Sequence, residues 1–201
     1  MRLFLAINLE PTIRRAIIDA TSALRDAAPT LSWVGEARLH LTLKFLGEES
    51  ESIVGPLSQS IDRVAQRHRT FPMQLGEIGA FPNFRRARVV WMGIEREPRL
   101  ELLHHDVELA CEQHAFELEG RAFRPHLTLA RVRDRTDVEE LRMLSRASKQ
   151  VEFGGESMVR SVDLMQSVTG KKSEGGRTTA GGRESRGSHY ERLHAAPLRP
   201  N

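Results

Sequence analysis

The sequence contains the tetrapeptide His-Leu-Thr-Leu twice, at residues 40–43 and 126–129. Two imidazoles and two hydroxyls, once brought together, are enough to cleave a phosphodiester by acid and base catalysis without a metal ion. A neutral imidazole can deprotonate an attacking water, while a protonated one donates to the leaving oxygen. The hydroxyls can hydrogen-bond the non-bridging oxygens. We therefore take His40, Thr42, His126 and Thr128 as candidate catalytic residues, and we expect no metal and no cofactor.

An extended strand would place the histidine and the threonine of each motif on the same face, and the leucines on the other face. At a rise of about 3.3 Å per residue, the imidazole and the hydroxyl are rooted about 6.6 Å apart, a span that one phosphate group can bridge. Two such strands would present both pairs across a shared cleft. A 2′,3′-cyclic phosphate suits this arrangement, because its strained ring places the leaving oxygen within reach of a fixed acid.

The repeat extends beyond the tetrapeptide. Residues 2–7 before the first motif resemble residues 88–94 before the second, Pro98 follows Pro11 by 87 residues, and His126 follows His40 by 86. The common unit is a strand, a helix, the motif strand and a second helix. The sequence therefore predicts two related lobes that face each other.

The hydrophobic periodicity and the positions of proline predict the individual elements. The expected helices cover 11–29, 53–64, 98–111 and 138–144, and the expected strands lie within 2–8, 33–46, 71–79, 89–94, 125–132, 159–168 and 190–193. Residues 169–188 are rich in glycine, serine, threonine and arginine, so we expect a disordered insertion. The prediction is one bilobal domain, formed by residues 1–168 and 189–196, with a tail over 197–201.

Composition limits the protein's location and partners. No run approaches the roughly 20 apolar residues that span a membrane, and the only cysteine is Cys111, so we expect a cytoplasmic monomer without membrane contact. The net charge of +3 is uneven, because residues 1–168 carry −1 and residues 169–201 carry +4. The overall charge is therefore a weak argument for RNA binding.

Four further side chains are candidates for substrate binding. Lys44 falls on the histidine face by alternation, where it would touch phosphate or extend into solvent. Arg131 alternates to the face opposite His126, so a role in the cleft needs the strand to end or twist there. Phe81 and Arg85 lie in a loop that would form a lip for stacking on bases and contacting the RNA backbone, or simply an exposed charged loop.

Several segments resemble the bacterial RNA 2′,3′-cyclic phosphodiesterases, which were first named 2′-5′ RNA ligases and belong to the two-histidine phosphoesterase superfamily. The similar segments are residues 2–7, 40–47, 79–82 and 124–131, and the resemblance covers about residues 2–168. It implies an α+β bilobal fold: two pseudo-symmetric antiparallel-sheet lobes with helices on the outside and the active-site cleft between them. It also implies His40 as proton donor and His126 as proton acceptor, roles that the residues alone do not assign. The glycine-rich insertion departs from the family pattern.

Two functions stay open at this point. The first is hydrolysis of RNA 2′,3′-cyclic phosphate ends to 2′-phosphomonoesters, with a weak 2′-5′ RNA ligase activity by reversal of related chemistry. The second is a non-catalytic module that binds nucleotide or RNA phosphates in the same cleft. The expected partners are RNA with 2′,3′-cyclic phosphate ends or small cyclic nucleotides.

Overall fold

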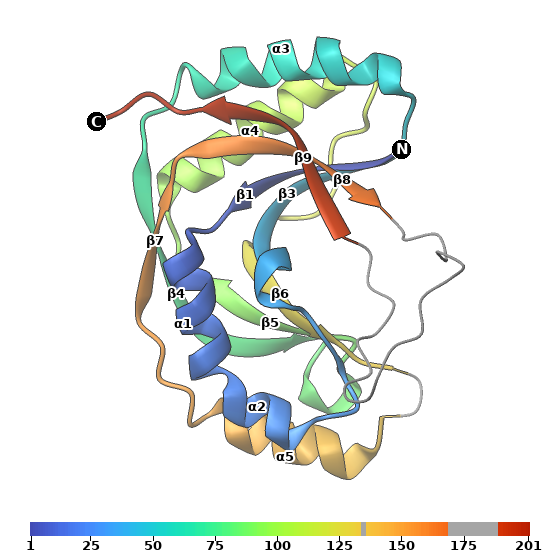
Figure 1. Cartoon of the computed structure of the whole chain (residues 1–201), viewed down its shortest axis with the longest axis vertical. Helices are drawn as coiled ribbons and strands as arrows, with labels where there is room; N and C mark the ends of the chain where they lie inside the picture. Colours follow the sequence, from blue (N-terminus) through green and yellow to red (C-terminus); the bar gives the residue numbers. More distant parts are fainter. Residues whose placement is uncertain (134–135, 169–188) are drawn as a thin grey trace, which may run out of the picture.

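One antiparallel nine-stranded sheet forms the centre of the molecule. The computed structural model describes residues 1–133, 136–168 and 189–201 (Figure 1). Eight strands follow one another across the sheet in the order β7 (Gly155–Val159), β4 (Phe71–Phe81), β5 (Val89–Ile94), β6 (His126–Arg131), β3 (His40–Glu48), β1 (Arg2–Asn8), β8 (Ser161–Val168) and β9 (His189–Pro197). The short β2 (Ser32–Trp33) pairs with β6.

The strand order is symmetric about its centre, where the two motif strands β3 and β6 pair antiparallel at Leu41 and Leu127. The next strands outward are β1 and β5, which precede the two motifs in the repeat. The prediction of two pseudo-symmetric antiparallel lobes is therefore confirmed. The lobes are joined edge to edge in one curved sheet, and the junction is the pair of motif strands.

Helices cover the outer side of each lobe (Figure 1). They are α1 (Pro11–Ala20), α2 (Ser22–Ala27), α3 (Val54–Ala65), α4 (Pro98–Glu112) and α5 (Val138–Ser148), with short 3-10 turns η1 (Glu36–Arg38), η2 (Glu51–Ile53) and η3 (Phe84–Arg86). The first helix of each repeat crosses to the other lobe. α1 follows β1 but contacts β7, whereas α4 follows β5 but contacts β3 and α3.

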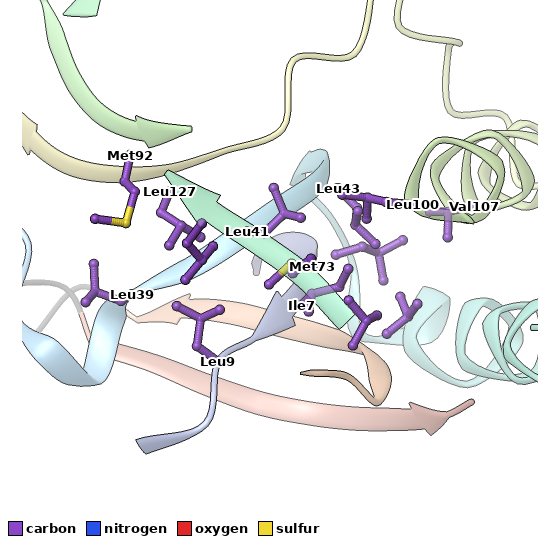
Figure 2. Close-up of a cluster of buried hydrophobic side chains, with 14 of the residues drawn as sticks. Ile7, Leu9, Leu39, Leu41, Leu43, Met73, Met92, Leu100, Val107 and Leu127 are labelled. Carbon is purple, nitrogen blue, oxygen red and sulfur yellow. The ribbon is translucent and has the colours of Figure 1, made fainter. Parts of the chain in front are cut away.

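One large hydrophobic core extends through both lobes beneath the sheet, and a smaller cluster is formed by Phe4, Ala6 and Met165. Figure 2 shows Leu41 and Leu127, the paired leucines of the two motifs, within this cluster. Their exposed fractions are 1% and 0%. At roughly 25 cal/mol for each Å² of buried apolar surface, such leucines fix the faces of their strands. The motif leucines therefore anchor the histidines and threonines on the opposite face.

The structure corrects several predicted boundaries. The first expected helix is divided into α1 and α2 at Thr21. The Thr21 hydroxyl donates to the Ile17 carbonyl over 2.7 Å, a contact that often bends helices. The strand predicted from residue 159 begins at Ser161 as β8, and Val159 is instead the last residue of β7. The residues of the predicted tail pack against the body of the protein, because Leu198 is only 4% exposed and the Thr70 amide donates to the Arg199 carbonyl. The insertion expected at 169–188 lies outside the described residues.

Candidate active site

The register of β3 and β6 brings the four motif side chains to one face of the sheet. Because Leu41 pairs with Leu127 in antiparallel strands, His40 lies opposite Thr128, and Thr42 lies opposite His126. Directly opposite residues have Cβ atoms about 4.5–5.5 Å apart, and diagonal ones about 7–8 Å apart. The two histidines therefore occupy opposite corners of a rectangle, with a threonine at each remaining corner.

Both imidazoles are held by the same local hydrogen bond. His40 Nδ1 lies 2.8 Å from the Arg38 carbonyl oxygen, and His126 Nδ1 lies 2.7 Å from the Arg124 carbonyl oxygen. A carbonyl oxygen only accepts, so each Nδ1 carries the proton and donates it. The Nε2 atoms remain for acid and base chemistry. His40 Nε2 lies 3.1 Å from the Thr42 hydroxyl, which places the first pair in direct contact.

Aromatic side chains from neighbouring strands pack against both imidazoles. The His40 ring centroid lies 5.0 Å from that of Phe4 and 5.3 Å from that of Tyr190, the latter at 88°. The His126 ring centroid lies 5.1 Å from that of Phe81, at 82°. Edge-to-face contacts of this kind fix ring orientation. Phe81 thus lies beside a candidate histidine, whereas Phe4 and Tyr190 were not predicted as site residues.

The surroundings of His40 favour its neutral form. Burial lowers the pKa of His40 below its ordinary value of 6.5, because the charged imidazolium loses hydration. The hydrogen bond to the Arg38 carbonyl opposes that shift, and the positive charge of Arg131 adds to it. An anionic ligand in the cleft would stabilise the imidazolium and raise the pKa again.

A β-bulge follows the motif in β3 and changes which side chains face the cleft. Thr42 pairs with Ala6 and Lys44 pairs with Leu5, so Leu43 is an extra residue. One extra residue reverses the alternation beyond it. Lys44 therefore does not continue the simple alternation, although it lines the hollow beside His126, and Phe45 takes the histidine face with 70% of its surface exposed.

The same bulge occurs at the equivalent point of β6. Thr128 pairs with Trp91 and Ala130 pairs with Val90, which leaves Leu129 as the extra residue. Arg131 is consequently turned toward the histidines, contrary to simple alternation, and it lines the cleft. The repeat thus places Phe45 and Arg131 at matching positions, five residues after His40 and His126.

The ammonium group of Lys44 is fully engaged by protein groups. Its Nζ donates to the two carboxylate oxygens of Glu108 over 2.9 and 2.8 Å and to the Glu117 carbonyl over 2.8 Å. An ammonium group has three N–H donors, and these contacts use all of them. Glu108 also accepts from the Glu119 amide over 2.9 Å. Lys44 therefore fastens the chain after α4 to β3, and the predicted phosphate contact has no donor left.

The motif residues line one continuous cleft made of two joined hollows. A hollow of about 940 Å³ is lined by His126, Phe81 and three arginines, Arg88, Arg121 and Arg124. A hollow of about 470 Å³ is lined by His40 and Tyr190. The residues that line both are Thr42, Phe45, Thr128 and Arg131. The size is that of ligand-binding sites, and the basic lining suits a phosphorylated ligand.

The remaining candidate and the possible metal sites lie apart from this cleft. Arg85 lines a separate groove between η3 and α5. Within the described part of the chain, no group of three or more histidine, cysteine, aspartate or glutamate side chains could hold a metal ion. The described residues also contain no helix that is both long and apolar enough to cross a bilayer.

The comparisons with known proteins agree with this geometry. The chain is 33% identical over 128 residues to an RNA 2′,3′-cyclic phosphodiesterase of Geobacillus stearothermophilus, an alignment that spans 64% of this chain and 41% of that relative. It is 31% identical over 172 residues to the protein of that name from Archaeoglobus fulgidus, which covers 86% of this chain and 94% of the relative. These relatives support assignment to this enzyme class.

The solved structures show the same architecture. The crystal structure of E. coli LigT complexed with 3′-AMP superposes with a TM-score of 0.68 at 28% identity, covering 98% of this chain and 97% of that one. The family model of the 2′-5′ RNA ligase superfamily matches residues 10–171, which include both motifs. The chain therefore belongs to the 2′-5′ RNA ligase superfamily.

Proposed function

We propose that the protein hydrolyses RNA 2′,3′-cyclic phosphodiester ends to 2′-phosphomonoesters by metal-independent acid and base catalysis. The observation that carries this proposal is the matched pair of hydrogen bonds from Nδ1 to a carbonyl, at His40 and at His126. Each bond fixes the tautomer and leaves Nε2 for proton transfer. Curated members of the family carry the name RNA 2′,3′-cyclic phosphodiesterase, which supports the substrate class.

The proposed reaction uses the two histidines, His40 and His126, which lie at diagonally opposite corners of the site. His126 accepts a proton from water as the water oxygen forms a bond to phosphorus. The bond from phosphorus to the 3′ oxygen breaks on the opposite side, and His40 donates a proton to that oxygen. The products are a 2′-phosphomonoester and a free 3′-hydroxyl. Thr42 and Thr128 hydrogen-bond the non-bridging oxygens, and Arg131 neutralises their charge.

The same groups account for a weak 2′-5′ ligase activity. If the 5′-hydroxyl of a second RNA strand replaces water, His126 accepts its proton and the 3′ oxygen leaves as before. The product is then a 2′-5′ phosphodiester. Water at high concentration competes with this nucleophile, so we expect hydrolysis to dominate.

A binding module without turnover is the second candidate function. The observation that favours it is the lowered pKa of His40, because a neutral imidazole cannot donate the proton that the leaving oxygen needs. Bound phosphate would offset this by stabilising the imidazolium. The two functions therefore differ in whether bound cyclic phosphate is consumed.

The decisive experiment is incubation of the protein with a nucleoside 2′,3′-cyclic phosphate in the presence of EDTA, followed by phosphorus NMR of the product. We expect the 2′-phosphate, with no loss of rate caused by the chelator. Activity that disappears with EDTA would refute the metal-free mechanism, and binding without product at any pH would favour the binding module.

Substitution of the histidines tests their roles. We expect His40→Ala and His126→Ala to lower kcat by at least about 100-fold each, the usual contribution of a positioned acid or base. His105→Ala is the matched control, since His105 is exposed on α4. Wild-type activity in either active-site variant would remove that histidine from the mechanism.

A further inference from the structure

A basic groove lies outside the catalytic cleft, between η3 and α5. Its volume is about 560 Å³. Its apolar floor consists of Phe84, Val138 and Leu141. Its basic rim consists of Arg85, Arg142 and Arg146. The proposed reaction uses none of the α5 residues.

The groove combines an apolar surface with three arginines, and no acidic side chain is among its lining residues. Val138 is 61% exposed, although it is a large apolar side chain at the start of a helix. Arg142 pairs with Glu139 over 3.1 Å, but both side chains are more than half exposed, so a phosphate can compete for this weak ion pair. The Nη1 atom of Arg146 lies 4.0 Å from the Met143 sulfur. An apolar face beside guanidinium groups is the composition that binds single-stranded nucleic acid.

The groove and the catalytic cleft are separate hollows, but one short segment of chain contributes residues to both. Phe81, Pro82 and Arg88 line the cleft, and Phe84 and Arg85, between them in sequence, line the groove. Three residues of chain, from Pro82 to Arg85, span at most about 11 Å. Since η3 contacts α5, which lies directly below β5 in Figure 1, a strand that leaves the cleft over this segment meets the arginines of α5.

We infer that this groove binds the nucleotides that precede the cyclic phosphate in a single-stranded RNA. The inference rests on the proposed function, which places the cyclic 3′ end in the cleft. The rest of that strand must leave the cleft. Along η3 and α5, its bases stack on Phe84 and its phosphates pair with Arg142 and Arg146. The groove thus distinguishes RNA ends from free cyclic nucleotides.

The test measures the turnover of two substrates by two double variants, one in the groove and one matched control. The substrates are a nucleoside 2′,3′-cyclic phosphate and a single-stranded RNA of about ten nucleotides that ends in a 2′,3′-cyclic phosphate. The groove variant is Arg142→Ala with Arg146→Ala. The control is Arg15→Ala with Arg67→Ala, which removes two exposed, ion-paired arginines from other surfaces.

We expect the groove variant to raise KM for the oligonucleotide about tenfold and to leave kcat and the turnover of the nucleotide unchanged. The slope of log affinity against log salt concentration should fall by about 1.4, the value for two lost phosphate contacts on a single strand. The control should change neither. Equal effects of the two double variants, or an equal loss on both substrates, would overturn the inference.

A binding measurement separates failure of this inference from failure of the proposed function. Fluorescence anisotropy of a labelled oligonucleotide should show weaker binding to the groove variant than to the control, whether or not the wild type turns over substrate. Absence of turnover with that difference intact would refute only the catalytic proposal. Turnover with identical binding by both variants would refute only the groove.

Discussion

Each of the two proposed catalytic histidines is oriented by the backbone two residues before it. The Arg38 and Arg124 carbonyls accept the Nδ1 protons where β3 and β6 begin, so the orientation of each ring depends on its own strand and not on the opposite lobe. The lobes then differ in the charges and aromatic rings that they add. Arg131 lies near His40, whereas Phe45, its equivalent in the repeat, carries no charge. This difference gives the two imidazoles distinct environments, as separate acid and base roles require.

The pH dependence should report the lowered pKa of His40. In its proposed role as proton donor, His40 must be charged, so activity falls as the pH rises through its pKa. Because burial holds that pKa below 6.5, the decline of kcat/KM, which reports the free protein, should be centred below pH 6.5. Bound phosphate raises the pKa, so the decline of kcat should lie at higher pH. Rates measured across this range give both curves.

Arg131→Ala provides the control for the electrostatic argument. Removal of this positive charge should raise the pKa of His40 and move the decline of kcat/KM to higher pH, while the weakened phosphate contact raises KM. Exchange of Arg131 for lysine keeps the charge and should keep the profile. A profile that does not move in Arg131→Ala would show that burial alone sets the pKa.

At the scale of elements, regular alternation predicts the site only as far as the motif threonines. The predicted face of His40 and Thr42 follows from the leucines between them, because these must enter the core. The bulges at Leu43 and Leu129 were not predictable, since they depend on the partner strands and a bulged leucine looks like any other core residue. Tyr190 was missed because its ring reaches His40 from β9, although β1 and β8 lie between β9 and β3 in the sheet.

The confirmed part of the fold comes from the repeat and the proline positions. The helix after Pro98 and the strand at 89–94 have the predicted bounds or nearly so. The edge strand β7 was missed because Gly155 and Glu156 weaken its apolar pattern. The crossing of α1 and α4 between the lobes could also not be predicted from the sequence, because an amphipathic helix face does not specify which sheet surface it covers.

Gly79 in β4 makes room for the aromatic wall of the His126 site. A Cβ atom at Gly79 would lie 2.1 Å from the indole of Trp91, whose ring packs against Phe81 with centroids 5.1 Å apart. We expect Gly79→Ala to displace Trp91 and then Phe81, to cost about 1–3 kcal/mol of stability and to lower kcat/KM. Thermal unfolding and steady-state kinetics measure both effects.

Gly76→Ala is the matched control in the same strand, because no atom lies within 4 Å of its added Cβ. It should leave activity near that of the wild type. Equal behaviour of the two alanine variants would contradict a specific role for the space at Gly79.

The buried pair of Lys44 and Glu108 ties three elements together, namely β3, α4 and the segment after α4 that lines the cleft. Their side chains are 7% and 8% exposed. Lys44→Met should lower the free energy of unfolding by about 3–5 kcal/mol, because it leaves the Glu108 carboxylate buried without its cation. Urea unfolding measures this, with exposed Lys149→Met as control. Addition of Glu108→Leu to Lys44→Met should recover part of the loss, and a cost confined to a few tenths of a kcal/mol would contradict the argument.

At the scale of the whole molecule, the site lies on the junction that makes the two lobes one body. β3 and β6 contribute the histidines and also join the halves of the sheet, and α1 and α4 each pack on the lobe opposite their own strand. The apolar core continues beneath that junction. Relative movement of the lobes would therefore break the sheet. We therefore expect the rectangle formed by His40, Thr42, His126 and Thr128 to be preformed in the free protein.

This architecture predicts that the lobes unfold together, and the chain carries a natural probe in each. Cys111, the single cysteine, is fully buried on α4, and burial raises the pKa of its thiol to about 12, so it reacts only when exposed. Trp33 and Trp91, the two tryptophans, lie on β2 and β5 of the other lobe. The extent of thiol labelling and the tryptophan fluorescence should show the same urea midpoint, as a single cooperative transition requires. Labelling of Cys111 at a lower urea concentration than the fluorescence change would mean that the α3 and α4 lobe opens separately, and the crossing helices would then not couple the two halves.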